Sequence, residues 1–356
     1  YFPAGKLRAL FEENPRLLRR AQAGEPKLGT IDSYLVYRMT GGLHVTDTTN
    51  ASRTQLMDLK RLRWDEDLLS LFGIPAEMMP ETILPADGSF GSYRGIPITG
   101  VLGDSHAALY GQGCHASGMA KATYGTGSSV MMNVGDAPVI SRRGLSASVA
   151  FSAGGRTHYA LEGNVTCSGD TLVWLCKTAG LFESPDEIER LAGTVDGAQG
   201  VEMVPAFAGL GAPHFDSDAR ALLCGMNRGT TKAHIAHAAL ASIAQQDADI
   251  LEIMQQESGY RPKWLFVDGG PTRNPLLMQM QADYAGCVIR SAVASELSAL
   301  GAAYIGGIRT GVYRDFESIP ARQAKGRTYE PTLTDAQRNE LRQSWKSAVR
   351  RALSGQ

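Results

Sequence analysis

The chain has 356 residues, 43% of them hydrophobic and 20% charged, which excludes wholesale disorder and is too long for one ordinary domain. Its 35 Lys and Arg residues balance 36 Asp and Glu residues, so the net charge of -1 argues against nucleic acid or an anionic membrane as the main partner. Five scattered cysteines without a CxxC pair indicate a reducing cytoplasm rather than a disulfide framework. No apolar run reaches the ~18 residues that a membrane-spanning helix needs.

The N-terminal part of the chain predicts short helices separated by loops. We expect helix over 5–23 with an interruption at Pro15, a second helix from Thr30 to Met39, an extended piece at HVTDTTN, and helix from Trp64 to Phe72. Closely spaced prolines then predict a loop region with short strands. The chain begins at Tyr1 rather than Met, from which we expect a protein that lacks its beginning.

From Ile96 onward, strands and helices alternate, which predicts α/β layers with at least one mixed sheet. The expected strands are Ile96–Leu102, Ala122–Val134, Ser146–Phe151, Thr157–Glu162 and Trp264–Val267. The expected helices are Asp104–Gly113, Gly169–Ala179, His234–Gln256, one that follows an Asn274 N-cap, and one from Thr334.

A first candidate site follows the strand that ends at Leu102. Asp104 stands where that strand meets a helix, and a carboxylate there can take a proton from a substrate hydroxyl. Asp is also favoured as a helix N-cap, so the residues leave both interpretations open. His106 is expected to be a core or surface residue of the helix rather than a base.

Two glycine-rich turns are candidate phosphate or nucleotide sites. The turn Gly125-Thr126-Gly127 exposes backbone N–H groups that can hold phosphate oxygens, although an ordinary hairpin turn uses the same residues. Gly269-Gly270 follows a strand and precedes a helix, which suggests close approach of a nucleotide to the backbone, or else a plain strand-to-helix turn. Neither turn matches GxGxxG or GxxxxGK[ST], so a dinucleotide fold loses support and a P-loop is excluded.

The sequences of several segments, and their order along the chain, resemble those of one known family. The segments GDSHAALYGQ, AKATYGTGSSVMMNVG, YALEGNVTCSGDTLVWL, VPAFAGLGAPHFDSDARALLCGMNRGT and VDGGPTRNPLLMQMQAD are similar to those of the FGGY carbohydrate kinases, and most of all to the glycerol kinases. The resemblance covers almost the whole chain. It implies an α/β, actin-like ATPase (ribonuclease H-like) fold, with a complete C-terminal domain and part of the N-terminal domain.

The same resemblance implies site residues and cofactors. It makes Asp104 the general base for transfer of the γ-phosphate of Mg-ATP to a hydroxyl of a polyol or sugar. It assigns Thr126 and Gly127 to the loop that faces the phosphates. It also implies that Gly169, Gly270 and Asn274 bind the nucleotide. Tyr1, Asp104, Ser105 and Ser129 fall at substrate-binding positions, and no residue is assigned to the metal.

Departures from the family pattern shape two further expectations. The family's N-terminal phosphate motif has no visible counterpart, so we expect this chain alone to be inactive. Where glycerol kinases have Gln and Phe beside the substrate, this chain has Ser105 and Ser129. Loss of an aromatic wall opens volume, and two hydroxyls suit extra hydroxyl groups. We therefore expect a polyol or ketose larger than glycerol, with glycerol itself as the alternative.

The expected organisation is a remnant of the N-terminal kinase domain over 1–107, a C-terminal, nucleotide-side domain over 108–333 and a helix over 334–356. The expected partners are a small polyol or sugar, with no nucleic acid and no membrane, and a homo-oligomer is left open. Two other classes stay open: a non-catalytic actin-like nucleotide-binding module, and a chaperone-type ATPase that hydrolyses ATP without a sugar.

Overall fold

A seven-stranded sheet organises the larger part of the molecule, in the order β15-β14-β13-β7-β8-β10-β9. The computed structural model describes residues 2–294, 296–319 and 326–355. The N-terminal elements are α1 (Pro3–Glu13), α2 (Pro15–Gln22), α3 (Ile31–Thr40), β1 (Val45–Asp47), α4 (Thr48–Ser52), β2 (Met57–Asp58), β3 (Arg63–Trp64), α5 (Glu66–Phe72), η1 (Ala76–Met78), β4 (Thr82–Leu84), β5 (Ser92–Tyr93) and β6 (Ile96–Pro97).

The remaining elements build the sheet and its cover. They are α6 (Asp104–Gly111), β7 (Ala120–Tyr124), β8 (Ser128–Gly135), β9 (Ser146–Ala153), β10 (Arg156–Val165), α7 (Gly169–Lys177), α8 (Pro185–Ala192), β11 (Glu202–Val204), β12 (Leu222–Cys224), α9 (Lys232–Ser258), β13 (Trp264–Gly269), η2 (Gly270–Arg273), α10 (Pro275–Ala285), β14 (Val288–Ser291), α11 (Leu297–Arg309), η3 (Phe316–Ser318), β15 (Thr328–Tyr329) and α12 (Asp335–Ala352).

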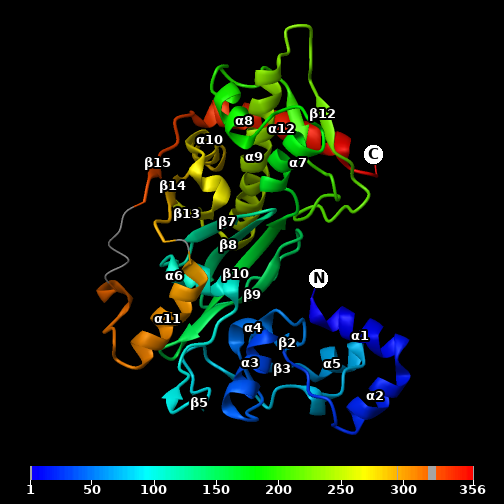
Figure 1. Cartoon of the computed structure of the whole chain (residues 1–356), viewed down its shortest axis with the longest axis vertical. Helices are drawn as coiled ribbons and strands as arrows, with labels where there is room; N and C mark the ends of the chain where they lie inside the picture. The colour runs from blue at the N-terminus through cyan, green and yellow to red at the C-terminus, as the bar shows by residue number, and fades with distance from the viewer. Residues whose placement is uncertain (1, 295, 320–325, 356) are drawn as a thin grey trace.

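Helices cover both faces of this sheet. The larger apolar core joins one face of β7 and β8 to the long helix α9 and to α10, and a second core joins the other face to α6 and α11. Figure 1 shows α9, α10 and α12 above the sheet, and the N-terminal helices α1 to α5 gathered below it. The sheet is mixed, because β13 runs parallel to β7 and β14 while β7, β8, β10 and β9 pair antiparallel.

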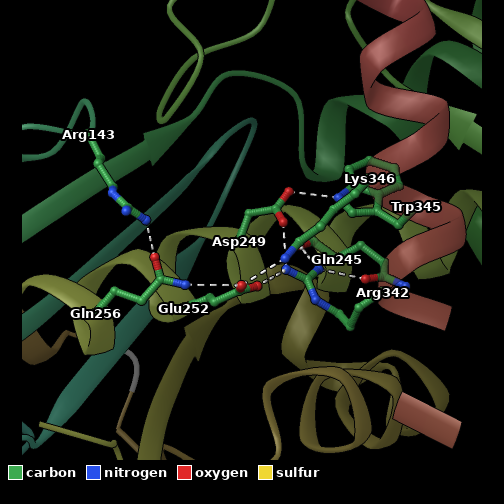
Figure 2. Close-up of polar contacts among 8 residues, drawn as sticks. All are labelled: Arg143, Gln245, Asp249, Glu252, Gln256, Arg342, Trp345 and Lys346. Atoms are coloured by element: carbon green, nitrogen blue, oxygen red, sulfur yellow. Dashed lines mark hydrogen bonds and ion pairs between the residues drawn. The ribbon is translucent and has the colours of Figure 1, made fainter. Parts of the chain in front are cut away.

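Helix α12 is fastened to α9 by a cluster of charges (Figure 2). Arg342 contacts the Asp249 carboxylate at 2.5 Å and donates to Gln245 Oε1 at 2.6 Å, and Lys346 pairs with Glu252 at 2.7 Å. The Trp345 indole N–H also donates to Asp249. The last helix is thereby held against the layer that α9 forms over the sheet.

Most of the sequence-based element predictions are confirmed, with identifiable exceptions. The expected strand Ile96–Leu102 is reduced to β6, and Ala122–Val134 is a hairpin of two strands broken at Gly125–Gly127. The extended piece HVTDTTN turns helical at Thr48 because the Asp47 carboxylate caps α4 by accepting from Thr49 and Asn50 N–H groups. Asn274 caps α10 as expected, accepting from Leu277 N–H.

Two further findings concern the classes of protein that the composition excluded. None of the helices in the described part of the chain combines the length and hydropathy that a membrane-spanning helix needs. All five cysteines carry free thiols.

Candidate active site

Asp104 is the first residue of α6 and its side chain is exposed. The N-cap of this helix is Gly103, and no side chain caps it. The carboxylate accepts from the Ser105 N–H at 2.7 Å, while the Ser298 hydroxyl on α11 donates to the Asp104 backbone carbonyl. The alternative role of Asp104 as an N-cap is therefore wrong, and its carboxylate lies at the surface.

The buried carboxylate of Asp47, at the end of β1, fixes the start of α6 through Thr49 on α4. The Thr49 hydroxyl donates to Asp47 at 2.6 Å and accepts from the Gly103 N–H at 2.8 Å. Burial raises the pKa of Asp47 to about 6, against the opposing effect of the Thr49 hydroxyl. The next residue of α6 after Ser105, His106, is buried and contacts the Ser148 hydroxyl. Burial lowers the pKa of His106 to about 3. His106 is a neutral core residue, as expected.

The turn between β7 and β8 lies against the first residues of α7. The Gly125 carbonyl accepts from Gly169 N–H at 3.0 Å, and the Thr126 carbonyl accepts from Ser168 N–H at 2.8 Å. A Cβ on Gly127 would lie 2.2 Å from the Val165 carbonyl oxygen, and a Cβ on Gly169 would lie 2.6 Å from the Gly125 carbonyl oxygen. These glycines are needed because backbones approach each other closely.

The second glycine turn lies beside the first. A Cβ on Gly269 would lie 1.9 Å from the Tyr124 carbonyl oxygen, and the φ of +100° also favours glycine there. The neighbouring Pro271 side chain would lie 3.3 Å from a Cβ on Gly169. Gly270, by contrast, is exposed, and a Cβ on it would meet nothing within 4 Å. The structure thus brings together Thr126, Gly127, Gly169 and Gly270, and Asn274 follows at the start of α10.

A polar cluster on the sheet, which the sequence reading missed, links these elements. Gln112, the C-cap residue of α6, donates to Asp268 Oδ1 at 3.3 Å, and Thr123 donates to the same oxygen at 2.7 Å. Lys121 donates to the Thr123 and Ser129 hydroxyls. A strand that alternates Lys121 and Thr123 with Ala120, Ala122 and Tyr124 carries the signal that could have found it: polar residues on one face only.

Ser129 lies inside this cluster rather than alone at a ligand. Its hydroxyl donates to Glu162 Oε1 at 3.0 Å and accepts from Lys121, and Glu162 pairs with Arg53 at 2.6 Å. Ser105 lies beside Asp104 on α6, and Tyr1 lies outside the described residues.

A metal would find few protein ligands here. Within residues 2–294, 296–319 and 326–355, no three His, Cys, Asp or Glu side chains gather in a way that could hold a metal ion. Mg²⁺ in phosphoryl-transfer sites is commonly held by one or two carboxylates together with substrate phosphates and water. The exposed Asp104 carboxylate fits that smaller requirement.

Family models match both parts of the chain. The model described as "FGGY family of carbohydrate kinases, N-terminal domain" matches residues 1–111, and the corresponding C-terminal domain model matches residues 120–310. The expectation that the family's N-terminal portion has no counterpart here is therefore wrong. The expectation of an inactive chain rested on that absence, and the match overturns it.

Two similar proteins are both named glycerol kinase. A protein of Alkalilimnicola ehrlichii named glycerol kinase is 46% identical over 359 residues, which are 99% of this chain and 72% of that relative. A protein of the same name in Deinococcus radiodurans is 43% identical, with the same coverage of both chains. The expectation of a substrate larger than glycerol is contradicted by these relatives. The Ser129 hydroxyl, which was expected to serve extra substrate hydroxyls, is engaged with Glu162 and Lys121.

Solved structures agree on the fold. The crystal structure of Plasmodium falciparum glycerol kinase with ADP superposes with a TM-score of 0.91 at 32% identity, covering 99% of this chain and 72% of that one. A gluconate kinase of Lactobacillus acidophilus superposes with a TM-score of 0.89 at 24% identity and the same coverage, which bears on the fold alone. The fold is the two-domain, actin-like ATPase fold that the sequence motifs implied.

Both domain models match, the relatives are similar over 99% of the chain, and the superposition extends over the same length. The chain therefore belongs to the FGGY family of carbohydrate kinases, which transfer a phosphoryl group to an alcohol group.

Proposed function

We propose that this protein transfers the γ-phosphate of ATP to a hydroxyl group of glycerol. The observation that carries the proposal is the placement of Asp104. Its exposed carboxylate begins helix α6, and the residue that ends α6, Gln112, contacts Asp268 directly before the Gly269-Gly270 turn. A proton acceptor and the residue before one candidate nucleotide turn are thus linked by the same helix. The relatives named glycerol kinase, and the relative solved with ADP, support the choice of substrates.

In this proposal Asp104 is the general base. A hydroxyl oxygen of glycerol attacks the γ-phosphorus, the bond from that phosphorus to the bridging oxygen of ADP breaks, and the hydroxyl proton passes to the Asp104 carboxylate. Phosphoryl transfer depends chiefly on positioning and on neutralising charge, so the protein needs little further chemistry. Bound Mg²⁺ would neutralise charge on the ATP phosphates, with Asp104 as the nearby protein carboxylate.

The other candidate residues take positions around this step. Thr126 and Gly127 face the phosphates, Gly169, Gly270 and Asn274 contact the nucleotide, and Ser105 and Ser129 are the substrate-binding residues. The family resemblance adds Tyr1, which lies outside the described residues. Residues 1–107 form the substrate side and residues 108–333 the nucleotide side, with 334–356 as the closing helix. The free thiols suit a reducing compartment, and we place the reaction in the cytoplasm.

A panel of acceptors tests the substrate. We expect the kcat/KM of the purified protein with ATP to be higher for glycerol than for a tetritol, a pentitol or a pentulose by about tenfold or more, because a pocket shaped for a short chain rejects added carbons. Equal or greater kcat/KM for any of the longer acceptors would contradict glycerol as the substrate. ATP consumption that no acceptor increases would contradict the kinase itself and favour a plain ATPase.

A further inference from the structure

Two glycine turns on the nucleotide side leave neighbouring parallel strands at the same edge of the sheet. In the register of β7 and β13, Thr123 is opposite Asp268 and Tyr124 is opposite Gly269. The Thr123 hydroxyl donates to Asp268 Oδ1 at 2.7 Å. This side-chain bond joins the two strands close to their turns, because Asp268 directly precedes Gly269 and only Tyr124 separates Thr123 from Gly125, so it fixes the spacing between the turns.

Lys121 determines which way that hydroxyl points. Its ammonium group donates to the Thr123 hydroxyl oxygen at 3.1 Å and to the Ser129 hydroxyl oxygen at 3.4 Å. A hydroxyl that accepts from an ammonium group has its one proton left for an acceptor on another side. Thr123 gives that proton to Asp268, and Ser129 gives its own to Glu162 at 3.0 Å.

The charge of Lys121 is balanced by carboxylates on three elements. The side chain is 1% exposed, and burial lowers its pKa, while Glu162 on β10, Asp268 on β13 and Asp104 on α6 oppose that shift. A buried ammonium without such partners would be strongly unfavourable. Because the group is enclosed by protein, it acts through its neighbours and not by touching a substrate.

The backbone around the turns has little room to absorb a displacement. The Tyr124 carbonyl oxygen lies where a Cβ of Gly269 would be, and the Val165 carbonyl oxygen lies where a Cβ of Gly127 would be. A shift of β13 against β7 therefore moves one turn relative to the other. Close-packed interiors transmit such shifts rather than dissipate them.

We propose that Lys121 is a positioning residue for the nucleotide: through the Thr123 hydroxyl it holds the turns after β7 and β13 at the spacing that the phosphates require. This inference rests on the proposed function for the identity of the ligand. Lys121 should affect the affinity for the nucleotide, and other residues should determine the affinity for glycerol.

The test measures the Kd of ADP by calorimetry for the purified chain and its variants, with the KM values for ATP and glycerol determined in parallel. Thr123→Val removes the bridging oxygen and should raise the Kd about tenfold, as expected for loss of a hydrogen bond to a charged group. Thr123→Ser keeps the oxygen and should bind ADP like wild type. Thr157→Val removes a similar hydroxyl bond, to Ser152 between β9 and β10, and should leave the Kd unchanged.

Lys121→Met should raise the Kd of ADP and the KM for ATP to the same extent as Thr123→Val. The double variant should add little to either change, because both substitutions break one linkage. If Lys121→Met does not fold, Thr123→Val and Thr123→Ser still test the linkage. The KM for glycerol should stay near the wild-type value in every folded variant.

Two results would overturn the inference: an unchanged ADP Kd in Thr123→Val, or equal weakening in Thr123→Val and Thr157→Val. In the first case, a lower melting temperature of Thr123→Val would identify a purely structural bond. The proposed function can fail separately. If wild type binds ADP and the variants weaken as expected, but glycerol is not phosphorylated, the inference holds and the acceptor is wrong.

Discussion

The two faces of the β7–β8 hairpin differ in what they contribute. Toward α9 the hairpin presents small and apolar side chains and one tyrosine, all 0–1% exposed: Ala120, Ala122, Tyr124, Val130 and Met132. Toward α6, near the turn, it presents Lys121, Thr123 and Ser129, joined to Asp268 and Glu162. One face joins the larger apolar core, and the other face, where it is near the turn, holds charges close to the candidate active site.

A single strand, β7, therefore contributes both to the apolar core and to the charged cluster. Because alternate side chains point to opposite faces, β7 can pack a core without placing an apolar group among the charges. Substitutions on the two faces should therefore separate: on the apolar face they should lower stability and spare the kinetics, and at the polar face they should alter the kinetics.

The largest effect is expected at Asp104, beside the polar face. In Asp104→Asn, kcat for glycerol should fall about 10²–10⁴-fold, because the hydroxyl proton loses its acceptor. The Kd of ADP should stay close to wild type. Steady-state kinetics and calorimetry check both. Asp335→Asn, at the start of α12, is the matched control and should leave kcat unchanged. Near-normal turnover in Asp104→Asn would remove the base from the mechanism.

In the core that α9 forms with the apolar face, Leu240→Ala should lower the free energy of unfolding by about 2–5 kcal/mol, because Leu240 is fully buried on α9 and its loss leaves a cavity. The KM for ATP in the folded protein should not change. Denaturant titration gives the stability, and Leu71→Ala, at a side chain that is 65% exposed, is the control. A raised KM for ATP in Leu240→Ala, without loss of stability, would contradict the expectation that substitutions on the apolar side lower stability and spare the kinetics.

Asp247, on α9, is a buried ionisable side chain in the layer that covers the apolar face. Burial raises its pKa from 3.8 to about 7, against the opposing effect of the Tyr124 and Ser128 hydroxyls. Between these values the folded chain holds a proton that the unfolded chain has released, so this group makes stability fall as pH rises from 3.8 to about 7. Removing it in Asp247→Asn should flatten the pH dependence by at most about 1.4 kcal/mol per pH unit.

Denaturant titrations at several pH values between 4 and 8 measure that slope. The exposed Asp218→Asn is the charge control. If wild type and Asp247→Asn show parallel pH curves, Asp247 does not take up a proton in the folded chain.

The smallest effect is expected for a charge that lies on neither face. Arg8 and Glu12 form an ion pair on α1, with side chains 54% and 65% exposed. Glu12→Gln should cost about 0.3–0.5 kcal/mol of stability, less at high salt, because exposed pairs are screened by water and ions. Thermal unfolding at low and high salt measures it. A cost as large as that of Leu240→Ala would mean that solvent exposure does not govern these energies.

Local signals in the sequence predicted much of the fold. Pro275 after an Asn cap defined the start of α10, and Gly41 ended α3 with a φ of 78°. The strand expected at Ile96–Leu102 was wrong beyond Pro97, because an apolar run does not reveal whether a partner strand lies beside it.

The candidate site was predictable only in part. Residue type alone indicates Asp104 at the start of a helix and the glycine turns at the ends of strands. Lys121 does not, because its importance comes from contacts with Thr123 on its own strand and with Ser129 on another, and from carboxylates on three elements. The preference expected for a larger substrate assumed that the Ser129 hydroxyl was available, and single-residue comparison cannot show that Glu162 already accepts its proton.

The most direct measurement of the central claim is the identity of the product. ³¹P NMR of wild type with ATP, Mg²⁺ and glycerol should show glycerol phosphate and ADP forming in equal amounts, and the same mixture with Asp104→Asn should show almost none. Formation of ADP with inorganic phosphate, and no phosphorylated glycerol, would contradict phosphoryl transfer to glycerol through Asp104.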